Sequence, residues 1–206
     1  MPNFAMTTRR LSRKGLQASL LALSLNFIAV SPAAAQSAQN LRFQEIKIKN
    51  FGQMDERFFR GAQPKERDYK SLAALGIKTI IDLQDDPTSY EKSAALAAGM
   101  RYVNIPMSST SRPREDQIDQ FLKLVNDPAT GRFFVHCAGG RHRTGVMGAV
   151  YRMSHDAWDF DRAYKEMKDY DFYTRFGHGS LKDYVQDYYG HQRSIEVSTG
   201  HSSSNH

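Results

Sequence analysis

His136-Cys137-Ala138-Gly139-Gly140-Arg141-His142-Arg143-Thr144-Gly145 is the stretch that decides how this chain folds. Residues 132–136, which lead into this stretch, are rich in aromatic and β-branched side chains and predict a buried strand. Residues 145–154, which follow from its last glycine, predict a packed helix. The stretch is therefore a strand-to-helix turn. Gly139 and Gly140 allow such a turn to point successive backbone N–H groups into one concavity, which fits a phosphate-sized anion.

The same turn places a nucleophile in a positive environment. Cys137 is the only cysteine in the sequence, so no disulfide can form within the chain. The N-terminus of the following helix and the guanidinium of Arg143 both favour negative charge. We therefore expect the Cys137 thiol to ionise well below its usual pKa of about 8.5 and to act as a nucleophile toward phosphorus.

The decamer resembles the His-Cys-x-x-Gly-x-x-Arg-Ser/Thr signature of the cysteine-dependent protein tyrosine and dual-specificity phosphatase superfamily. Within it, the run Gly140–Gly145 has glycine, a basic residue and then His-Arg-Thr-Gly. This run is most similar to bacterial relatives of the plant-and-fungal atypical dual-specificity phosphatases. The similarity extends weakly from Phe59 to Tyr189. It implies hydrolysis of phosphoproteins or inositol polyphosphates through a cysteinyl-phosphate, with neither a metal nor a cofactor.

The chemistry and the resemblance together suggest a role for each residue of the signature. Cys137 attacks phosphorus, Thr144 donates a hydrogen bond to the departing sulfur, and His136 orients the loop or is simply a satisfied residue at the strand end. The oxygens of the phosphate are held by the backbone and side chains of Ala138, Gly139, Gly140, Arg141, His142 and Arg143.

The general acid departs from the family pattern. In the family it is usually an Asp on the loop before the helix that leads into the signature strand, but residues 105–114 contain no acid. The nearest acids are Glu115 and Asp116, and we assign Asp116 as the acid. Both residues also fit ordinary helix N-terminal acids that complement the dipole. Asp85 and Asp86 are secondary candidates that suit a turn cap.

Arg141 and His142 add two basic groups to the signature. Extra positive charge favours substrates with more than one phosphate, and the resemblance points the same way. The alternative is that Arg141 faces solvent or pairs with an acid on a neighbouring helix.

Outward from the signature, strand and helix patterns alternate. We expect a single α/β domain at residues 41–190, with a central, largely parallel sheet of about four to five strands flanked by helices. The predicted strands are residues 43–48, 58–60, 79–82, 101–104 and 132–136. Predicted helices begin at Pro64, Tyr90, before Ile118, after an Asp159 cap and after a Ser180 cap.

The first 35 residues carry the pattern of a secretory signal peptide. Four bases between Arg9 and Lys14 precede the short apolar run Leu16–Val30, and an Ala-x-Ala pattern ends at Ala35. The apolar run is short for a membrane-spanning helix, although an uncleaved anchor is the alternative. Thr8-Arg9-Arg10-Leu11 faintly resembles a twin-arginine signal. We expect a periplasmic or secreted protein without stable membrane insertion after cleavage.

The charge of the chain is mostly that of its leader. The whole sequence has a net charge of +6, but residues 36–206 contain 24 bases and 22 acids, which gives no reason to expect nucleic-acid binding. Residues 191–206 are polar and predicted to be disordered, and three scattered histidines there are expected to be solvated rather than to bind metal. We expect a monomer whose partner is a phosphorylated protein or small-molecule phosphate.

Two other functions remain open from the sequence. A similar loop serves arsenate reduction or sulfur transfer, and an inactive domain could hold phosphorylated ligands without hydrolysis. The turn Arg60-Gly61-Ala62-Gln63-Pro64 resembles one near the start of these phosphatase domains. Arg60 either supports the structure or lines the rim of the pocket.

Overall fold

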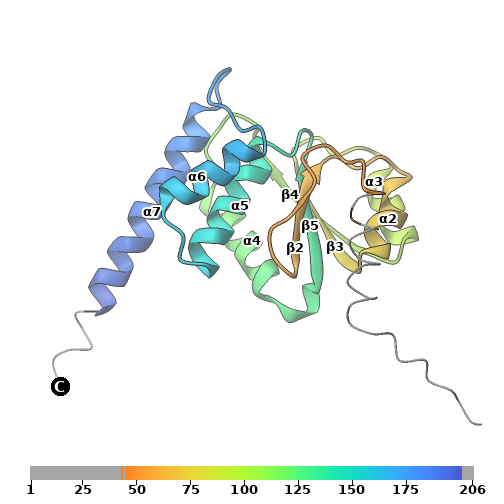
Figure 1. The fold of residues 1–206 in the computed structure, drawn as a ribbon, viewed down its shortest axis with the longest axis horizontal. Coiled ribbons are helices and arrows are strands. Elements are labelled where there is room, and N and C mark those ends of the chain that lie inside the picture. Colours follow the sequence, from red (N-terminus) through yellow and green to blue (C-terminus); the bar gives the residue numbers. More distant parts are fainter. Residues whose placement is uncertain (1–42, 44, 201–206) are drawn as a thin grey trace, which may run out of the picture.

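A five-stranded sheet forms the centre of the computed structural model, which describes residue 43 and residues 45–200 (Figure 1). The strand order is β1-β2-β5-β3-β4, and every neighbouring pair is parallel except β1 with β2. The strands are β1 Gly52–Gln53, β2 Phe58–Ala62, β3 Ile77–Gln84, β4 Arg101–Met107 and β5 Arg132–Cys137. The prediction of one α/β domain with a largely parallel sheet is confirmed.

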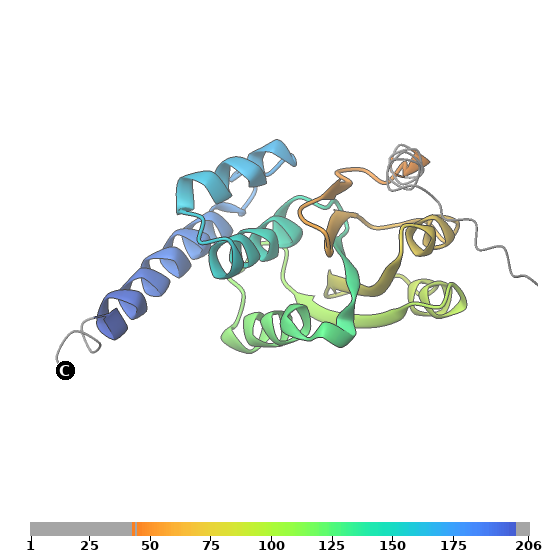
Figure 2. The ribbon, with the colours of Figure 1, turned by 60° about the horizontal axis from the view of Figure 1, so that its bottom comes forward.

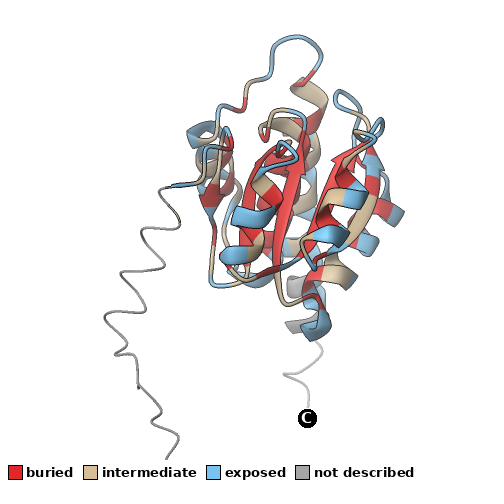
Figure 3. Ribbon diagram, turned by 90° about the vertical axis from the view of Figure 1, so that its right-hand side faces the viewer, coloured by how far each residue is buried: buried red, intermediate tan, exposed pale blue. Residues whose placement is uncertain are grey.

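Helices cover both faces of the sheet, and this is why its central strands are buried along most of their length (Figures 2 and 3). One face packs against α2 (Asp68–Ala74) and α3 (Glu91–Ala97), and the other against α4 (Glu115–Asn126) and α5 (His142–His155). Side chains alternate along β5: Phe133, Val135 and Cys137 join the core under α4 and α5, whereas Phe134 joins the opposite core. His136 therefore faces away from the nucleophile's side of the sheet.

Two further helices pack on the outer side of α5. Asp159 caps α6 (Phe160–Asp169) by accepting from the N–H of Arg162, as predicted. The last helix, α7, spans Gly179–Gly200, so the prediction of disorder is wrong for residues 191–200. An established helix gains one backbone hydrogen bond for each added residue, and no proline interrupts this segment. Residues 201–206 lie outside the described part.

Three local predictions differ from the structure at the start of elements. Phe43 and Glu45 are helical and residues 46–48 are irregular, so the predicted strand is wrong. The apolar side chains of that segment pack on the α2–α3 core, and the edge strand is β1. Helix α2 begins at Asp68 rather than Pro64, because residues 65–68 form a turn. Ser180 lies inside α7 and donates to the carbonyl of Thr110 instead of capping.

The parallel arrangement brings four strand ends to one edge of the sheet. Ala62 pairs with Cys137, and β3 and β4 end beside β5 at Gln84 and Met107. In α/β sheets, ligands bind at such carboxyl ends. The predicted signal peptide, residues 1–35, lies outside the described residues. Within the described residues, no helix has the length and apolar character needed to cross a membrane.

Candidate active site

The signature forms a cradle between the end of β5 and the start of α5. Gly140 has a φ of +65°, and an added Cβ would lie 2.4 Å from the carbonyl carbon of Gly61 and 2.5 Å from the nitrogen of Ala62. This position therefore requires glycine. At Gly139 the nearest atoms to an added Cβ are 3.7 Å away and belong to the side chain of Arg141. Of the two predicted glycine requirements, only the one at Gly140 follows from the geometry.

Three residues from outside the signature hold its carbonyl groups. The side chain of Asn50 donates to the carbonyl of Gly139 at 2.8 Å, and Arg60 donates to that of Gly140 at 2.7 Å. The backbone N–H of Gln63 reaches the carbonyl of Ala138 at 3.4 Å. These three contacts anchor the loop to residues at and near β2.

Arg60 supports the loop from within the fold and does not line the rim. Its side chain is fully buried, and its guanidinium stacks 3.9 Å from the centre of the Tyr170 ring. Burial lowers the pKa of Arg60 to about 10, which leaves it charged at neutral pH. The Arg60–Pro64 turn was the sequence signal for this contact. No sequence pattern indicated Asn50.

Cys137 combines near-complete burial with hydrogen-bond donors aimed at its sulfur. Burial raises the pKa of the Cys137 thiol, but hydrogen bonds from the hydroxyl and N–H of Thr144 act in the opposite direction. The charge of Arg143 and the N–H of Gly140 lower the pKa further, so it lies below its ordinary value. The hydroxyl oxygen of Thr144 is buried, and no oxygen or nitrogen atom of the described chain is its hydrogen-bond partner. Such a thiol is ionised more readily than free cysteine.

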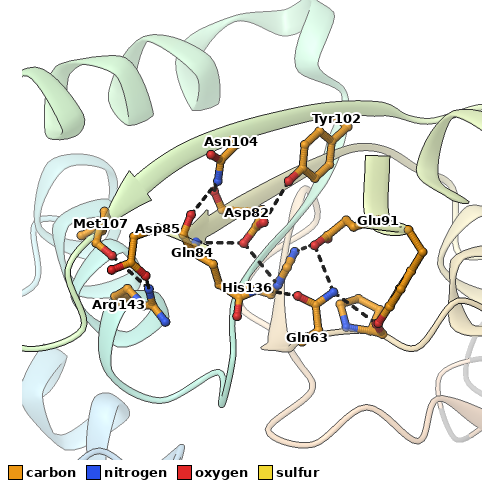
Figure 4. A network of polar contacts seen from close by, with 12 residues as sticks. Gln63, Asp82, Gln84, Asp85, Glu91, Tyr102, Asn104, Met107, His136 and Arg143 are labelled. Carbon is orange, nitrogen blue, oxygen red and sulfur yellow. Dashed lines mark hydrogen bonds and ion pairs between the residues drawn. The ribbon is translucent and has the colours of Figure 1, made fainter. Parts of the chain in front are cut away.

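Arg143 lies beside the cradle, and its guanidinium is almost fully buried. Its Nη1 atom donates to Oδ1 of Asp85 at 2.7 Å and to the carbonyl of Met107 at 2.9 Å (Figure 4). Asp85 directly follows β3, and Met107 ends β4. The secondary candidate Asp85 therefore contacts the signature, whereas no described contact joins Asp86 to it.

Asp116 lies at the start of α4 with 68% of its side chain exposed. Both carboxylate oxygens accept from Arg114, at 2.9 and 2.8 Å. The hydrogen bond from Arg114 lowers the pKa of Asp116. A general acid must be protonated when the substrate is bound, and these contacts favour the ionised form. They disfavour the predicted role for Asp116.

The two extra basic residues of the signature have different neighbours. The Nε atom of Arg141 lies 3.9 Å from a carboxylate oxygen of Asp171, which is an acid in the turn after α6 and not, as the predicted alternative had it, on a neighbouring helix. The ring of His142 stacks on His178 with centroids 3.5 Å apart. Burial and the charge of His178 lower the pKa of His142 to about 4. His142 is therefore neutral at neutral pH and adds no charge for a second phosphate.

His136 is fully buried between two carboxylates on the other face of the sheet (Figure 4). Its Nε2 atom is 2.6 Å from Glu91, and its Nδ1 atom is 3.9 Å from Asp82. Burial lowers the pKa of His136, but the hydrogen bond and charge of Glu91 outweigh this effect and raise it. Gln63 also donates to Glu91, at 3.0 Å.

This buried network connects the strand end to the loop. Asp82, Glu91 and His136 are the residue types that bind metals. One possible ligand atom from each residue lies within 4.8 Å of the other two. In this structure the two carboxylates approach different nitrogens of the imidazole, at 2.6 and 3.9 Å. The arrangement is that of an ion-pair network. Gln63 joins the network to the loop, because its side chain donates to Glu91 and its backbone N–H donates to the carbonyl of Ala138. The orienting role of His136 stays a prediction.

A nucleophilic cysteine in a backbone cradle at the end of a parallel strand, followed by an arginine on the next helix, defines the site of a cysteine-dependent phosphatase. The family described as "DSP-PTPase phosphatase fused to NAD+ Kinase" matches residues 26–179. The chain belongs to this family of dual-specificity-type phosphatases. This result favours phosphatase chemistry over arsenate reduction or sulfur transfer.

Individual relatives agree with the family. The probable tyrosine-protein phosphatase DG1060 of Dictyostelium discoideum is 27% identical over 139 residues, covering 65% of this chain and 79% of the relative. Inositol diphosphatase DSP1 of Oryza sativa is 27% identical over 110 residues, covering half of each protein. The structure of a cysteine-to-serine variant of Pseudomonas aeruginosa TpbA in complex with pTyr has a TM-score of 0.60 at 22% identity, covering 71% of this chain and 90% of TpbA. At this level of identity, the similarity to TpbA shows a shared fold.

Proposed function

We propose that this phosphatase works through a covalent phosphate on Cys137 and prefers substrates whose leaving group needs little protonation. The observation that carries the first part is the Cys137 thiol, with Thr144 and Gly140 donating to its sulfur and Arg143 beside it. The Cys137 thiolate attacks phosphorus in line, the sulfur–phosphorus bond forms, and the bond to the leaving oxygen breaks. Water then attacks phosphorus and releases inorganic phosphate and the thiolate.

The cradle residues stabilise charge in both steps. Backbone N–H groups of residues 138–143 and the guanidinium of Arg143 bind the equatorial oxygens, where negative charge accumulates in the transition state. Thr144 donates to sulfur and so stabilises the thiolate as it departs in the second step. These roles need no metal ion, because fixed dipoles and one arginine supply the positive potential.

The substrate preference is inferred from the acids around the cradle. Residues 105–114 contain none, and hydrogen bonds lower the pKa of both nearby carboxyls: from Arg114 at Asp116, and from its own N–H and then Arg143 at Asp85. An alkyl phosphate, such as phosphoserine, releases a strongly basic alkoxide that requires a proton from the enzyme. Aryl phosphates and the terminal phosphate of a diphosphate release weaker bases. The rice relative is an inositol diphosphatase, which supports the anhydride as one substrate class.

A leaving-group series tests this preference. The wild-type enzyme is assayed on substituted aryl phosphates, a diphosphorylated inositol, a phosphotyrosine peptide and a phosphoserine peptide. We expect kcat/KM to fall steeply as the leaving group becomes more basic, and Asp116→Asn to leave that slope unchanged. A shallow slope that becomes steep in Asp116→Asn would establish Asp116 as the general acid and overturn the proposal.

We also propose that the enzyme acts outside the cytoplasm. The support is the run of four bases, the apolar segment and the Ala-x-Ala pattern within residues 1–35. Cell fractionation with N-terminal sequencing tests this proposal. A mature protein beginning at residue 36 in the periplasm or medium is expected, and a full-length protein confined to the cytoplasm would contradict it.

A further inference from the structure

The guanidinium of Arg143 is held from one side only. The side chain of Arg143 is 8% exposed. Within the described chain Arg143 donates two side-chain hydrogen bonds, and both come from its Nη1 atom. Asp85 supplies a carboxylate from the end of β3 and Met107 a carbonyl from the end of β4 (Figure 4). A buried cation requires such partners, because an unpaired one is strongly destabilising.

The other edge of the guanidinium has the geometry for binding an oxyanion. Nε and Nη2 lie side by side on a planar arginine and form a fork that matches two oxygens of a phosphate. Among the described residues, the hydrogen bonds of Arg143 involve neither atom. Fixing Nη1 therefore leaves the forked edge available.

We propose that Asp85 is a positioning residue, which together with the carbonyl of Met107 orients Arg143 so that its Nε–Nη2 edge faces the phosphate. This proposal rests on the proposed function, because it assigns the phosphate-binding edge of a residue in that site. Asp85 acts through Arg143 and does not touch the reacting atoms.

Two other roles for Asp85 give different expectations. As a general acid, Asp85 would have to be protonated, but hydrogen bonds from its own N–H and from Arg143 outweigh the effect of burial and lower its pKa. As a competitor for Arg143, the carboxylate would have to leave before phosphate binds, and its removal would then tighten binding.

The test compares Asp85→Asn with Asp86→Asn, which changes the adjacent exposed acid on the same loop. Orthovanadate inhibition measures oxyanion binding without a leaving group, and the aryl phosphate series measures turnover. For Asp85→Asn we expect about tenfold weaker vanadate inhibition, which corresponds to about 1.4 kcal/mol. We expect a similar loss of kcat/KM that is equal for all leaving groups, and near wild-type values for Asp86→Asn.

A double-mutant cycle with Arg143→Lys separates positioning from general destabilisation. If Asp85 acts through Arg143, its substitution should have little further effect once the fork is gone. Additive losses would contradict the proposal, and so would tighter vanadate binding or a loss confined to poor leaving groups in Asp85→Asn. Failure of the proposed function would be seen differently: the Cys137→Ser variant would hydrolyse substrate as well as the wild type does.

Discussion

Replacing Gly140 by alanine should destabilise the fold, whereas the same change at Gly139 should not. Alanine at a φ of +65° costs about 1–2 kcal/mol in the left-handed region. The added Cβ at Gly140 would meet backbone atoms of β2 at 2.4–2.6 Å, and such overpacking typically costs about 1–3 kcal/mol. The reduced entropy of the unfolded chain offsets about 0.4–1 kcal/mol.

The net expectation for Gly140→Ala is a loss of about 1–5 kcal/mol in the free energy of unfolding. Urea denaturation, followed by circular dichroism, gives this quantity from the midpoint and slope. Gly139→Ala is the matched control, because its Cβ would meet only the Arg141 side chain at 3.7 Å. Equal midpoints for the two variants would refute the reasoning that the close approach of the loop to β2 requires glycine at 140.

Four further outcomes follow from the site. The rate of Cys137 alkylation by iodoacetamide should rise with pH around a midpoint below about 8.5, because the lowered thiol pKa enlarges the thiolate fraction at neutral pH; a midpoint above that value would contradict the assigned environment. Arg143→Lys should weaken vanadate inhibition and lower kcat/KM, since a point charge cannot replace a fork, and unchanged values would place the cradle elsewhere. Arg141→Ala should lower kcat/KM for a multiply phosphorylated inositol by about tenfold while sparing p-nitrophenyl phosphate; equal losses would mean that Arg141 supports the loop. Thr144→Ala should slow breakdown of the cysteinyl-phosphate more than its formation, which burst kinetics would show as a larger burst, and an unchanged burst would remove Thr144 from the second step.

The parts of the site that could be predicted are those encoded at short range. The strand, the glycines, Arg143 and Thr144 lie within the signature or next to it, and their spacing alone predicts a turn that binds an anion. The long-range contacts were not predictable. Asn50 reaches a carbonyl 89 residues away, and Asp85 reaches Arg143 across 58 residues. Neither pair is linked by a periodic pattern.

The errors in the fold have similar physical causes. The alternation of apolar residues from Phe43 indicates which side chains are buried. These side chains are buried against the α2–α3 core, although the segment is not a strand. The polar composition of residues 191–200 indicates that this segment does not form part of a hydrophobic core. Composition alone does not indicate that the helix continues into this segment from the packed part of α7. The assignment of Asp116 as the general acid is not an error of this kind and stays a prediction, but its ion pair with Arg114 could be seen only in three dimensions.

The central claim is that Cys137 carries the phosphate during turnover. Rapid acid quench of the enzyme during hydrolysis of an aryl phosphate, followed by mass spectrometry of the peptides, tests it directly. We expect a phosphorylated peptide containing Cys137, present at early times and absent from Cys137→Ser. Full turnover with phosphate on another residue, or with no covalent intermediate at any time, would contradict it.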